Sequence, residues 1–405
     1  MSLPATADAV VVGGGTIGGW CAHFLKASGL RDVVLLERGV LGQGASSRAA
    51  GIVRGQGGTP PAVLLGSWTR DFYRRQAEEL GIDSGFVEQG YFMPAFTPEQ
   101  VGQARERMAM QRGLGLEVEW LDPEAADARN PTLAPGSTLG GTFAERDGYL
   151  DPPRNVLAYA VTLARDGVHV AERTAFRGLV RSSSDALVGV ATAAGPVATG
   201  LVVLTGGPTL AEVGTLAGVR IPAGGARHQV AVTRPHPDFD LTRDPSRLPM
   251  VFDVAEGLYW RPEDRGVLFG MSNPLEPPGE AREVDWPYLE LMRGRLAELV
   301  PATRGLGLRR VWAATIDYTP DHLPIIGPAI DKDGPIPGVT VACAGGHGMM
   351  WGPAVSRVTA DVALNGRTDV LDVSELGLDR FDEDGRSRLA ADPIALPFPE
   401  SAISS

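Results

Sequence analysis

Residues 9–18 read AVVVGGGTIG, so a run of four apolar residues is followed at once by a loop of glycines. An uninterrupted apolar run is typical of a strand that is buried on both faces of a parallel sheet. The loop fits the pattern G-x-G-x-x-G, and apolar residues then recur at helical spacing from Ile17 to Leu25. The sequence therefore predicts a strand, a tight glycine turn and a helix in direct succession.

A second apolar run, residues 33–36, follows this helix and ends directly before Glu37. The order of strand, glycine loop, helix, strand and acid predicts the first unit of a dinucleotide-binding fold. In such a unit Gly13 permits the turn, Gly15 lets a pyrophosphate approach the backbone, and Gly18 lets the helix pack against the sheet. Glu37 is expected to bind both ribose hydroxyls of an adenosine, which argues against a 2′-phosphate. The alternative is an ordinary tight turn in an α/β protein.

Residues 42–51 read GQGASSRAAG, a long run of small residues soon after the acid. An NAD-dependent enzyme usually starts another helix at this point. Small residues instead let the backbone pass against a large flat ligand, such as the ribityl chain and ring of a flavin. The run therefore favours FAD over NAD, with a flexible surface loop as the alternative on composition alone.

The composition is that of an acidic globular protein. The 405 residues suggest two or three domains at about 150 residues each. The net charge of −12 repels phosphate backbones and anionic lipids, so neither nucleic acid nor a membrane is an expected partner. No apolar run reaches the length of about 18 residues that a spanning helix needs, and no signal peptide is predicted.

The two cysteines, Cys21 and Cys343, could form one bond at most. Disulfides are therefore not expected to hold the fold, and the expected location is a reducing cytoplasm. No pattern of residues predicts a metal site.

Two later segments repeat the pattern of a buried strand followed by glycine. Residues 201–204 (LVVL) precede Thr205 and Gly206, and residues 339–344 (VTVACA) precede the loop GGHG and an amphipathic helix. The N-terminus of that helix can stabilise negative charge, and a reduced flavin carries such charge near N1 and the C2 carbonyl. Backbone donors at this place would favour reduction of a flavin. Simple packing of a strand against a helix is the alternative, and His347 in the loop is either structural or a ligand contact.

Between these segments the sequence predicts a hairpin and a set of antiparallel strands, at residues 186–199, 226–234, 250–254, 257–261, 266–271 and 311–315. The chain thus leaves the nucleotide-binding domain and returns to it. The predicted fold class is α/β, or α+β overall: a discontinuous FAD-binding dinucleotide domain with an inserted substrate domain on a mostly antiparallel sheet. The predicted FAD-binding domain comprises residues 1–85, 145–215 and 318–378, and the substrate-binding domain comprises 86–144 and 216–317. Residues 379–405 form a tail whose order the composition leaves open.

With these residues in place, the sequence resembles the FAD-dependent family of D-amino-acid oxidase, glycine oxidase and sarcosine oxidase. The resemblance rests on AVVVGGGTIGG, VVLLERG, GASSRAAGIVR, TPDHLPIIGP and CAGGHGMMWGPAVSRVTADVALNG. These segments span nearly the whole chain in the family's order. The resemblance implies that the cofactor is FAD.

The resemblance also implies which residues bind the cofactor. It implies phosphates over Gly13–Gly18, the flavin beside the small-residue run and against Gly346–Met350, and a backbone contact from Phe176 to the adenine. The implied cofactor-binding residues are Gly13, Gly15, Thr16, Ile17, Gly18, Glu37, Arg38, Ser46, Ser47, Arg48, Ala50, Gly51, Ile52, Phe176, Thr205, Gly206, Gly346, His347, Gly348, Met349 and Met350.

The chain departs from the family at several places. The cysteine that holds FAD covalently in some relatives is replaced by Ala314, which implies non-covalent FAD. The carboxylate-binding arginine of glycine oxidase is replaced by Ile316, whereas Arg54 matches an arginine of the sarcosine oxidase type. Met350 replaces a lysine of that type, and Tyr259 stands near the position of its oxygen-activating lysine. The electron acceptor is therefore left open.

The sequence predicts FAD-dependent oxidation of the C–N bond of an amino acid or N-substituted glycine, by hydride transfer to flavin N5 and hydrolysis of the imine. O2 is the expected acceptor, giving H2O2. Arg54 is expected to hold the substrate carboxylate, Tyr259 to add a phenolic donor, and Met350 to line a pocket open to longer, apolar amines. The alternatives are a dehydrogenase that uses a protein or quinone acceptor and a flavin-binding subunit without turnover. The oligomeric state is left open.

Overall fold

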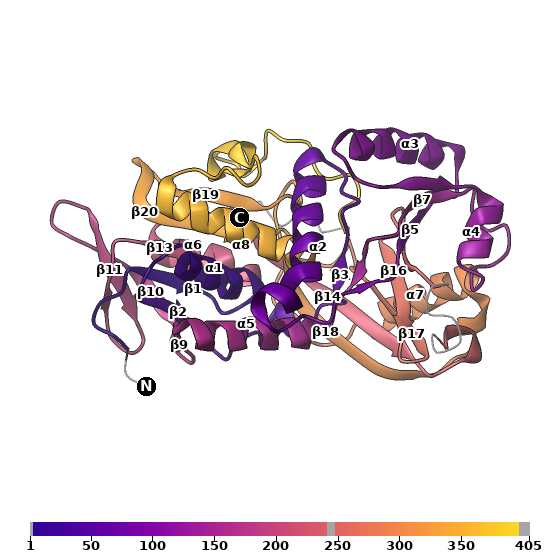
Figure 1. Cartoon of the computed structure of the whole chain (residues 1–405), viewed down its shortest axis with the longest axis horizontal. Coiled ribbons are helices and arrows are strands. Elements are labelled where there is room, and N and C mark those ends of the chain that lie inside the picture. Colours follow the sequence, from indigo (N-terminus) through magenta and orange to yellow (C-terminus); the bar gives the residue numbers. More distant parts are fainter. Residues whose placement is uncertain (1–2, 241–247, 397–405) are drawn as a thin grey trace.

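The computed structural model describes residues 3–240 and 248–396. Figure 1 shows an elongated molecule with one large sheet towards each end and helix α2 (Pro60–Leu80) between them. The chain passes from one sheet to the other and back, so segments far apart in the sequence meet in the middle of the molecule.

The first sheet has six strands in the order β19-β20-β13-β1-β2-β9. All neighbours in it are parallel except the edge strand β19, which pairs antiparallel with β20. The strands are β1 (Ala9–Val12), β2 (Val33–Leu36), β9 (His169–Ala171), β13 (Val202–Leu204), β19 (Ile325–Asp331) and β20 (Gly334–Cys343). The apolar runs at 9–12 and 33–36 and residues 202–204 of the third run are wholly buried in this sheet, as a parallel sheet requires, whereas Leu201 is half-buried.

The first sheet is covered on both faces because alternate residues of β1 belong to opposite hydrophobic clusters. Val10 and Val12 pack in one cluster with residues of α6, whereas Val11 packs in the other with Trp20 of α1 and Tyr159 of α5. The covering helices are α1 (Thr16–Ala27), α5 (Pro152–Asp166), α6 (Leu210–Ala217) and α8 (Gly348–Asn365). Helix α1 lies against α8 and α5, and Gly18 makes the packing of α1 on the sheet possible, because a Cβ there would collide with the Gly13 carbonyl.

Two small sheets accompany the first sheet. One contains β10 (Phe176–Arg181), β11 (Leu187–Thr192) and β12 (Val197–Ala198), so the predicted hairpin at 186–199 is confirmed. The other contains β3 (Ile52–Val53), β8 (Gly148–Tyr149) and β4 (Val87–Glu88). Strand β4 lies inside the segment 86–144 that was predicted for the substrate domain, but it pairs with β8, so this small sheet joins the two parts of the molecule.

The second large sheet has eight strands in the order β18-β14-β17-β16-β15-β5-β7-β6. Every neighbouring pair is antiparallel except β5 with β15. The strands are β5 (Tyr91–Pro94), β6 (Glu119–Leu121), β7 (Gly141–Ala144), β14 (Gly224–Thr233), β15 (Met250–Asp253), β16 (Leu258–Glu263), β17 (Gly266–Met271) and β18 (Leu308–Tyr318). The predicted combination of a mostly parallel dinucleotide-type sheet and a mostly antiparallel second sheet is confirmed.

Helix α7 (Trp286–Leu299) covers one face of the second sheet. Its residues Leu289, Met292 and Leu296 pack in a cluster with Trp260 and Phe269 of the sheet. The remaining helices of this part are α3 (Pro98–Gly113) and α4 (Pro123–Arg129), and each begins at a side chain that caps it, Thr97 and Asp122 respectively. The opposite face of the sheet is turned towards the middle of the molecule.

The segment after α8 returns to the middle of the molecule. We call residues 380–396 the strap. The buried guanidinium of Arg380 donates to both carboxylate oxygens of Asp321, at 2.7 and 3.0 Å, in the loop that follows β18. Ile394 and Leu396 of the strap are buried against the second sheet. Residues 379–396 of the predicted tail are therefore packed, while residues 397–405 lie outside the described part.

None of the helices in the described part of the chain has the length and the apolar composition that crossing a membrane requires. Cys21 and Cys343 are buried free thiols, and burial raises the pKa of each to about 12. Both thiols are therefore neutral and unreactive at ordinary pH.

Candidate functional site

A cavity of about 450 Å³ lies between the first sheet and the inner face of the second. Val12, Leu36 and Thr205, at the carboxyl ends of β1, β2 and β13, line it on one side. Tyr91 and Tyr259 of the second sheet line it on the other side. Ligands of open parallel sheets bind at the carboxyl ends of the strands, so this is the place where a dinucleotide is expected.

The glycine loop after β1 is held by Glu37. One oxygen of the Glu37 carboxylate accepts a hydrogen bond from the Gly14 N–H at 2.8 Å, and the other accepts one from the Gly39 N–H at 2.7 Å. Glu37 lines the cavity and keeps further lone pairs on both oxygens. The geometry is compatible with the predicted binding of ribose hydroxyls.

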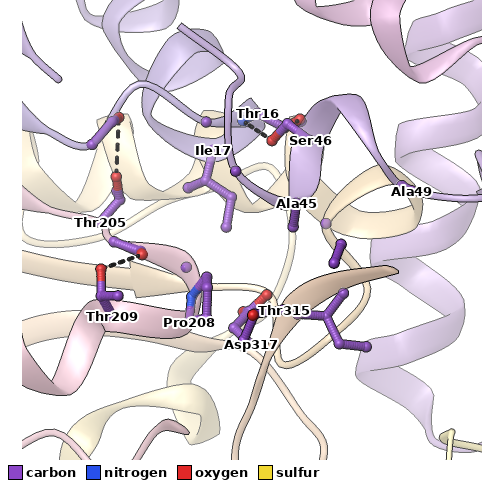
Figure 2. Close-up of a pocket in the computed structure, with 18 of the residues that line it drawn as sticks. Thr16, Ile17, Ala45, Ser46, Ala49, Thr205, Pro208, Thr209, Thr315 and Asp317 are labelled. Carbon is purple, nitrogen blue, oxygen red and sulfur yellow. Dashed lines mark hydrogen bonds between the residues drawn. The ribbon is translucent and has the colours of Figure 1, made fainter. Parts of the chain in front are cut away.

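The small-residue run crosses the start of α1. Ser46 lies in one 3₁₀ turn, Ala45–Ser47, and its Oγ accepts a hydrogen bond from the Thr16 N–H at 2.9 Å (Figure 2). A Cβ on Gly15 would meet only this oxygen, at 3.2 Å, so the backbone of Gly15 is otherwise open. The first turn of α1 contains no acidic residue. This helix start is thus accessible to an anion from the cavity.

Ser47 is the one predicted cofactor-binding residue that does not line the cavity. Its N–H is bonded to the Gly42 carbonyl at 3.2 Å inside the turn that presents Ser46. The other predicted cofactor-binding residues all line the cavity: Gly13, Gly15, Thr16, Ile17, Gly18, Glu37, Arg38, Ser46, Arg48, Ala50, Gly51, Ile52, Phe176, Thr205, Gly206, Gly346, His347, Gly348, Met349 and Met350.

Figure 2 shows the side of the cavity opposite α1. Thr205, Pro208 and Thr209 follow β13 there, and Thr315 and Asp317 of β18 lie close by. The Asp317 carboxylate accepts a hydrogen bond from the Ala344 N–H at 3.2 Å, which ties β18 to the second glycine loop. Burial raises the pKa of Asp317, while backbone N–H groups of that loop oppose the rise.

The second glycine loop brings the start of α8 to the cavity. His347 in this loop is buried, its Nδ1 lies 3.1 Å from the Gly345 carbonyl oxygen, and its ring centroid is 4.3 Å from that of Trp351. Burial lowers the pKa of His347 to about 3, so the ring is neutral at ordinary pH. The first turn of α8 contains no acidic residue, so two helix starts without acids line one cavity.

Arg54 lies in the cavity with 2% of its surface exposed. Its guanidinium donates to the carbonyl oxygens of Gln56 and, at 3.2 Å, of Ile394. The rings of Tyr91 and Phe252 flank it, with centroids 5.9 and 5.7 Å from Cζ. No carboxylate within residues 3–240 and 248–396 forms an ion pair with it. The buried Asp392 carboxylate interacts with Arg54 electrostatically without forming an ion pair. A buried cation whose hydrogen-bond acceptors are all neutral still attracts an anion.

A second buried charge fixes the loop that carries Arg54. The Asp147 carboxylate accepts hydrogen bonds from the N–H groups of Gly55 and Gln56, at 2.9 and 3.3 Å, and from Arg70 at 3.1 Å. Burial raises the pKa of Asp147, and the neighbouring charge of Arg70 opposes that rise. The Asp147 carboxylate therefore fixes the backbone after Arg54, whereas the guanidinium of Arg54 is bonded to the carbonyl oxygens of Gln56 and Ile394.

Tyr259 lines the cavity as part of a hydrogen-bonded chain that we did not predict. Its hydroxyl lies 2.5 Å from Nε2 of His228, and Nδ1 of His228 lies 2.8 Å from the Ser272 hydroxyl. Burial lowers the pKa of His228 to about 4 and raises that of Tyr259. At ordinary pH the neutral imidazole of His228 is therefore hydrogen-bonded to the neutral phenol of Tyr259.

Three further predicted residues need comment. Met350 is buried and lines the cavity together with Ile52. At the other end Phe176 is buried, while Arg38 forms an ion pair with Glu280 at 3.0 Å near the rim. All three predicted substrate-binding residues, Arg54, Tyr259 and Met350, thus lie in the same cavity as the glycine loops.

The lining residues that the sequence analysis missed include Tyr91, Phe252, Ile394 and Leu396. They form an apolar wall with Tyr259 around the guanidinium. Phe252 lies on a strand that was predicted and Tyr91 on one that was not, and nothing in the sequence shows which face of either strand meets the glycine loops. Residues 394 and 396 carry no motif at all.

The residues present fit FAD. The cavity joins two helix starts, an acid after the second strand and a wall of backbone and small side chains, which are the features a flavin dinucleotide needs. Neither Cys21 nor Cys343 lines the cavity, and Ala314 does.

Comparison with known proteins gives the same picture. The sequence model of the family described as FAD dependent oxidoreductase matches residues 8–362. The 4-methylaminobutanoate oxidase (formaldehyde-forming) of Paenarthrobacter nicotinovorans is 28% identical over 390 residues, which cover 94% of this chain and 46% of that protein. Mitochondrial dimethylglycine dehydrogenase of Rattus norvegicus is 28% identical over 394 residues, covering 93% of this chain and 45% of that protein. The chain spans about half the length of these two relatives.

Solved structures of similar length also match. L-proline dehydrogenase from P. horikoshii has a TM-score of 0.86 at 26% identity, covering 95% of this chain and 100% of that chain. Glycine oxidase from Geobacillus kaustophilus has a TM-score of 0.80 at 26% identity, covering 94% of this chain and 100% of that chain. These matches confirm the predicted fold class and the predicted resemblance, and they include both oxidases and dehydrogenases.

Proposed function

Because the chain belongs to the family of FAD-dependent oxidoreductases, we propose that it oxidises the C–N bond of an amine that carries a carboxylate, an amino acid or an N-substituted glycine. The observation that carries this proposal is Arg54, a buried cation without a carboxylate partner in the described chain, in the same cavity as both glycine loops. The names of the relatives support a substituted amine, since methylaminobutanoate, dimethylglycine and proline are not primary amines.

We assign the residues that line the cavity to FAD as the sequence analysis did. The start of α1 would hold the pyrophosphate, Glu37 the adenosine ribose, and Gly346–Met350 the flavin. Ser46 would act indirectly, by fixing the first turn of α1. When bound, FAD supplies an acceptor for a hydride. The proposal includes non-covalent attachment, because no thiol lines the cavity.

Arg54 would bind the substrate carboxylate. Two parallel hydrogen bonds from a guanidinium to a carboxylate are both strong and directional. The substrate carboxylate would provide an anion for the buried guanidinium. The two hydrogen bonds would hold the α-carbon in a fixed place beside the flavin end of the cavity. Tyr91, Phe252 and Met350 would exclude water and surround the apolar part of the amine.

Tyr259 would hold the amine as the neutral base. An ammonium group cannot release a hydride from its neighbouring carbon, so it has to lose a proton first. If Nδ1 of His228 donates to Ser272, Nε2 accepts a hydrogen bond from the Tyr259 hydroxyl, and the phenolic oxygen can then accept a hydrogen bond from an amine N–H and orient the amine. Because burial lowers the pKa of His228 to about 4, the proton of the ammonium group leaves to solvent and not to this pair.

Anaerobic titration of the holoprotein tests this function. Sarcosine, glycine, D-amino acids and longer N-carboxymethyl amines are added while the flavin absorbance is followed. Bleaching by a carboxylated amine, and not by the same amine without its carboxylate, is the expected result. A yellow protein that none of these compounds bleaches would instead be a flavin-binding subunit without turnover.

For the electron acceptor we propose O2, because the 4-methylaminobutanoate oxidase and the glycine oxidase of Geobacillus kaustophilus, both 28% identical to this chain, are oxidases. One observation favours a dehydrogenase instead: the chain has two lysines, Lys26 and Lys332, and neither lines the cavity, so no lysine is present to stabilise superoxide. Stopped-flow reoxidation of the reduced protein in air separates the two. A rate no faster than that of free flavin excludes the oxidase.

A further inference from the structure

The strap reaches the cavity from an anchor, Arg380 and Asp321, that does not line the cavity. Asp321 accepts hydrogen bonds from Arg380, from the Ser387 hydroxyl at 2.6 Å and, through its carbonyl, from the Asp392 N–H at 3.0 Å. The side chains of Arg380 and Asp321 are almost fully buried, so this ion pair is sheltered from water. The strap is therefore fixed to Asp321 at three residues up to the start of its last turn.

That last turn presents one carbonyl and two side chains to the cavity. The Asp392 carboxylate accepts a hydrogen bond from the Ile394 N–H at 3.0 Å, which closes the turn. The Ile394 carbonyl then accepts from Arg54 at 3.2 Å, and the side chains of Ile394 and Leu396 pack with Tyr259. The strap and the substrate arginine thus share one hydrogen bond.

The strap also packs against the loop that follows Arg54. Gly58 lies so close to Asp392 that a Cβ there would collide with the carboxylate. The loop is therefore held by Asp147 on one side and by the strap on the other. A shift of the strap would move Arg54 as well.

We propose that Ile394 and Leu396 determine substrate specificity, by restricting the group on the substrate's α-carbon. This inference rests on the proposed function, because it requires Arg54 to hold a carboxylate. The α-carbon is bonded to that carboxylate, and the Ile394 carbonyl is hydrogen-bonded to the same guanidinium, so the strap forms part of the wall around the α-carbon. A hydrogen there fits, whereas a methyl or larger group meets a buried isoleucine. The site therefore selects N-substituted glycines over α-branched amino acids and proline, while the nitrogen substituent remains unrestricted by the strap.

The test uses two series of compounds on the holoprotein. Binding of acetate, propionate, isobutyrate and pivalate is followed by the change in flavin absorbance, which needs no turnover. Reduction by sarcosine, N-methylalanine and proline is followed anaerobically. The wild-type protein is expected to favour acetate and sarcosine. Ile394→Ala and Leu396→Ala are expected to reduce each preference by about tenfold, the effect of one or two methyl groups in a pocket.

Leu389→Ala is the matched control. Leu389 belongs to the strap but packs in a different hydrophobic cluster and does not line the cavity, so both preferences are expected to stay as in the wild-type protein. If an alanine variant does not fold, Ile394→Val removes one methyl group with little loss of packing, and Leu396→Phe should sharpen the preference instead of relaxing it.

The outcomes separate this inference from the proposed function. If carboxylates bind and the wild-type protein discriminates, but the strap variants discriminate equally, the assignment of Ile394 and Leu396 is wrong and the function stands. If the wild-type protein accepts N-methylalanine and proline as readily as sarcosine, the assignment is also wrong. If no carboxylate binds to the holoprotein, the role of Arg54 and the proposed function both fail.

Discussion

Arg54 is buried without an ion-pair partner in the described chain. Within the described residues its guanidinium has carbonyl oxygens and aromatic rings as neighbours, and no ion pair. The residue itself was predictable, since it stands at a recognisable place after the small-residue run. Its surroundings were not, because Phe252 and Ile394 are about 200 and 340 residues away in the chain, and Asp392, whose carboxylate interacts with Arg54 electrostatically, is equally distant. Local patterns locate such a residue, and only the folded chain shows its partners.

Arg54→Met is expected to weaken binding of carboxylates by at least 30-fold, because removing one partner of a buried charge pair costs about 2–5 kcal/mol. The dissociation constant of acetate from the holoprotein measures this directly, and KM for the substrate should rise in parallel. Arg367→Met, at an exposed arginine, is the control. Equal acetate affinity in Arg54→Met and the wild-type protein would contradict the assignment.

Tyr259→Phe is expected to slow flavin reduction by about tenfold, because the amine loses one orienting hydrogen bond, which contributes about 1.4 kcal/mol. The loss should be the same at every pH, since Tyr259 and His228 both stay neutral in this range. Anaerobic stopped-flow reduction between pH 6 and 10 gives the profile. An unchanged rate of reduction would mean that Tyr259 only packs against His228.

At the scale of elements, the glycine loops and their strands were predictable because each depends on a short stretch of sequence. The runs 9–12 and 33–36 and residues 202–204 are buried strands, and the strands expected from 226 to 315 are present. Helices α2 and α5 were not predicted, although α5 begins at a capping aspartate. The strand that contains His228 was predicted correctly. The residue itself was not predicted as part of the site, because its partner Tyr259 lies across the intervening strand β17.

Gly18→Ala is expected to lower both FAD affinity and stability, because the new Cβ would collide with the Gly13 carbonyl and push α1 away from the loop. The cost should be about 1–3 kcal/mol, as for other overpacked sites. Fluorescence titration of apoprotein with FAD and urea unfolding of the apoprotein measure the two effects.

Gly102→Ala is the control for that experiment. Gly102 lies inside α3 with open space around it, so the same substitution should stabilise the protein by about 0.5–1 kcal/mol. If both variants bind FAD as the wild-type protein does, the close approach of α1 to the loop is not required for binding.

At the scale of the whole molecule, the site exists because two sheets of different type face each other. The parallel sheet supplies backbone and helix starts, and the antiparallel sheet supplies Tyr91, Phe252 and Tyr259. Bringing them together buries several ionisable groups. His228 and His347 are kept neutral by burial, with pKa values of about 4 and about 3. Stability should therefore depend on pH in a way that reports on this contact.

The free energy of unfolding is expected to fall as the pH falls from about 6.5 to about 4, because His228 takes up a proton in the unfolded chain throughout this range and in the folded chain only at its end. His228→Gln should lose about 3 kcal/mol less than the wild-type protein between pH 7 and pH 4. The buried carboxyls of Asp147, Asp317 and Asp392, with raised pKa values, act in the opposite sense but equally in both proteins. Urea unfolding at both pH values gives the difference, and parallel curves would contradict it.

The strap follows every strand of both sheets in the chain, and this order has a consequence during synthesis. A ribosome that has released residues up to α8 has already made the whole cradle of glycine loops, while Ile394 and Leu396 are still unmade or inside the exit tunnel. If the strap restricts the substrate as proposed, the residues that would hold FAD are therefore made before the residues that would set its specificity.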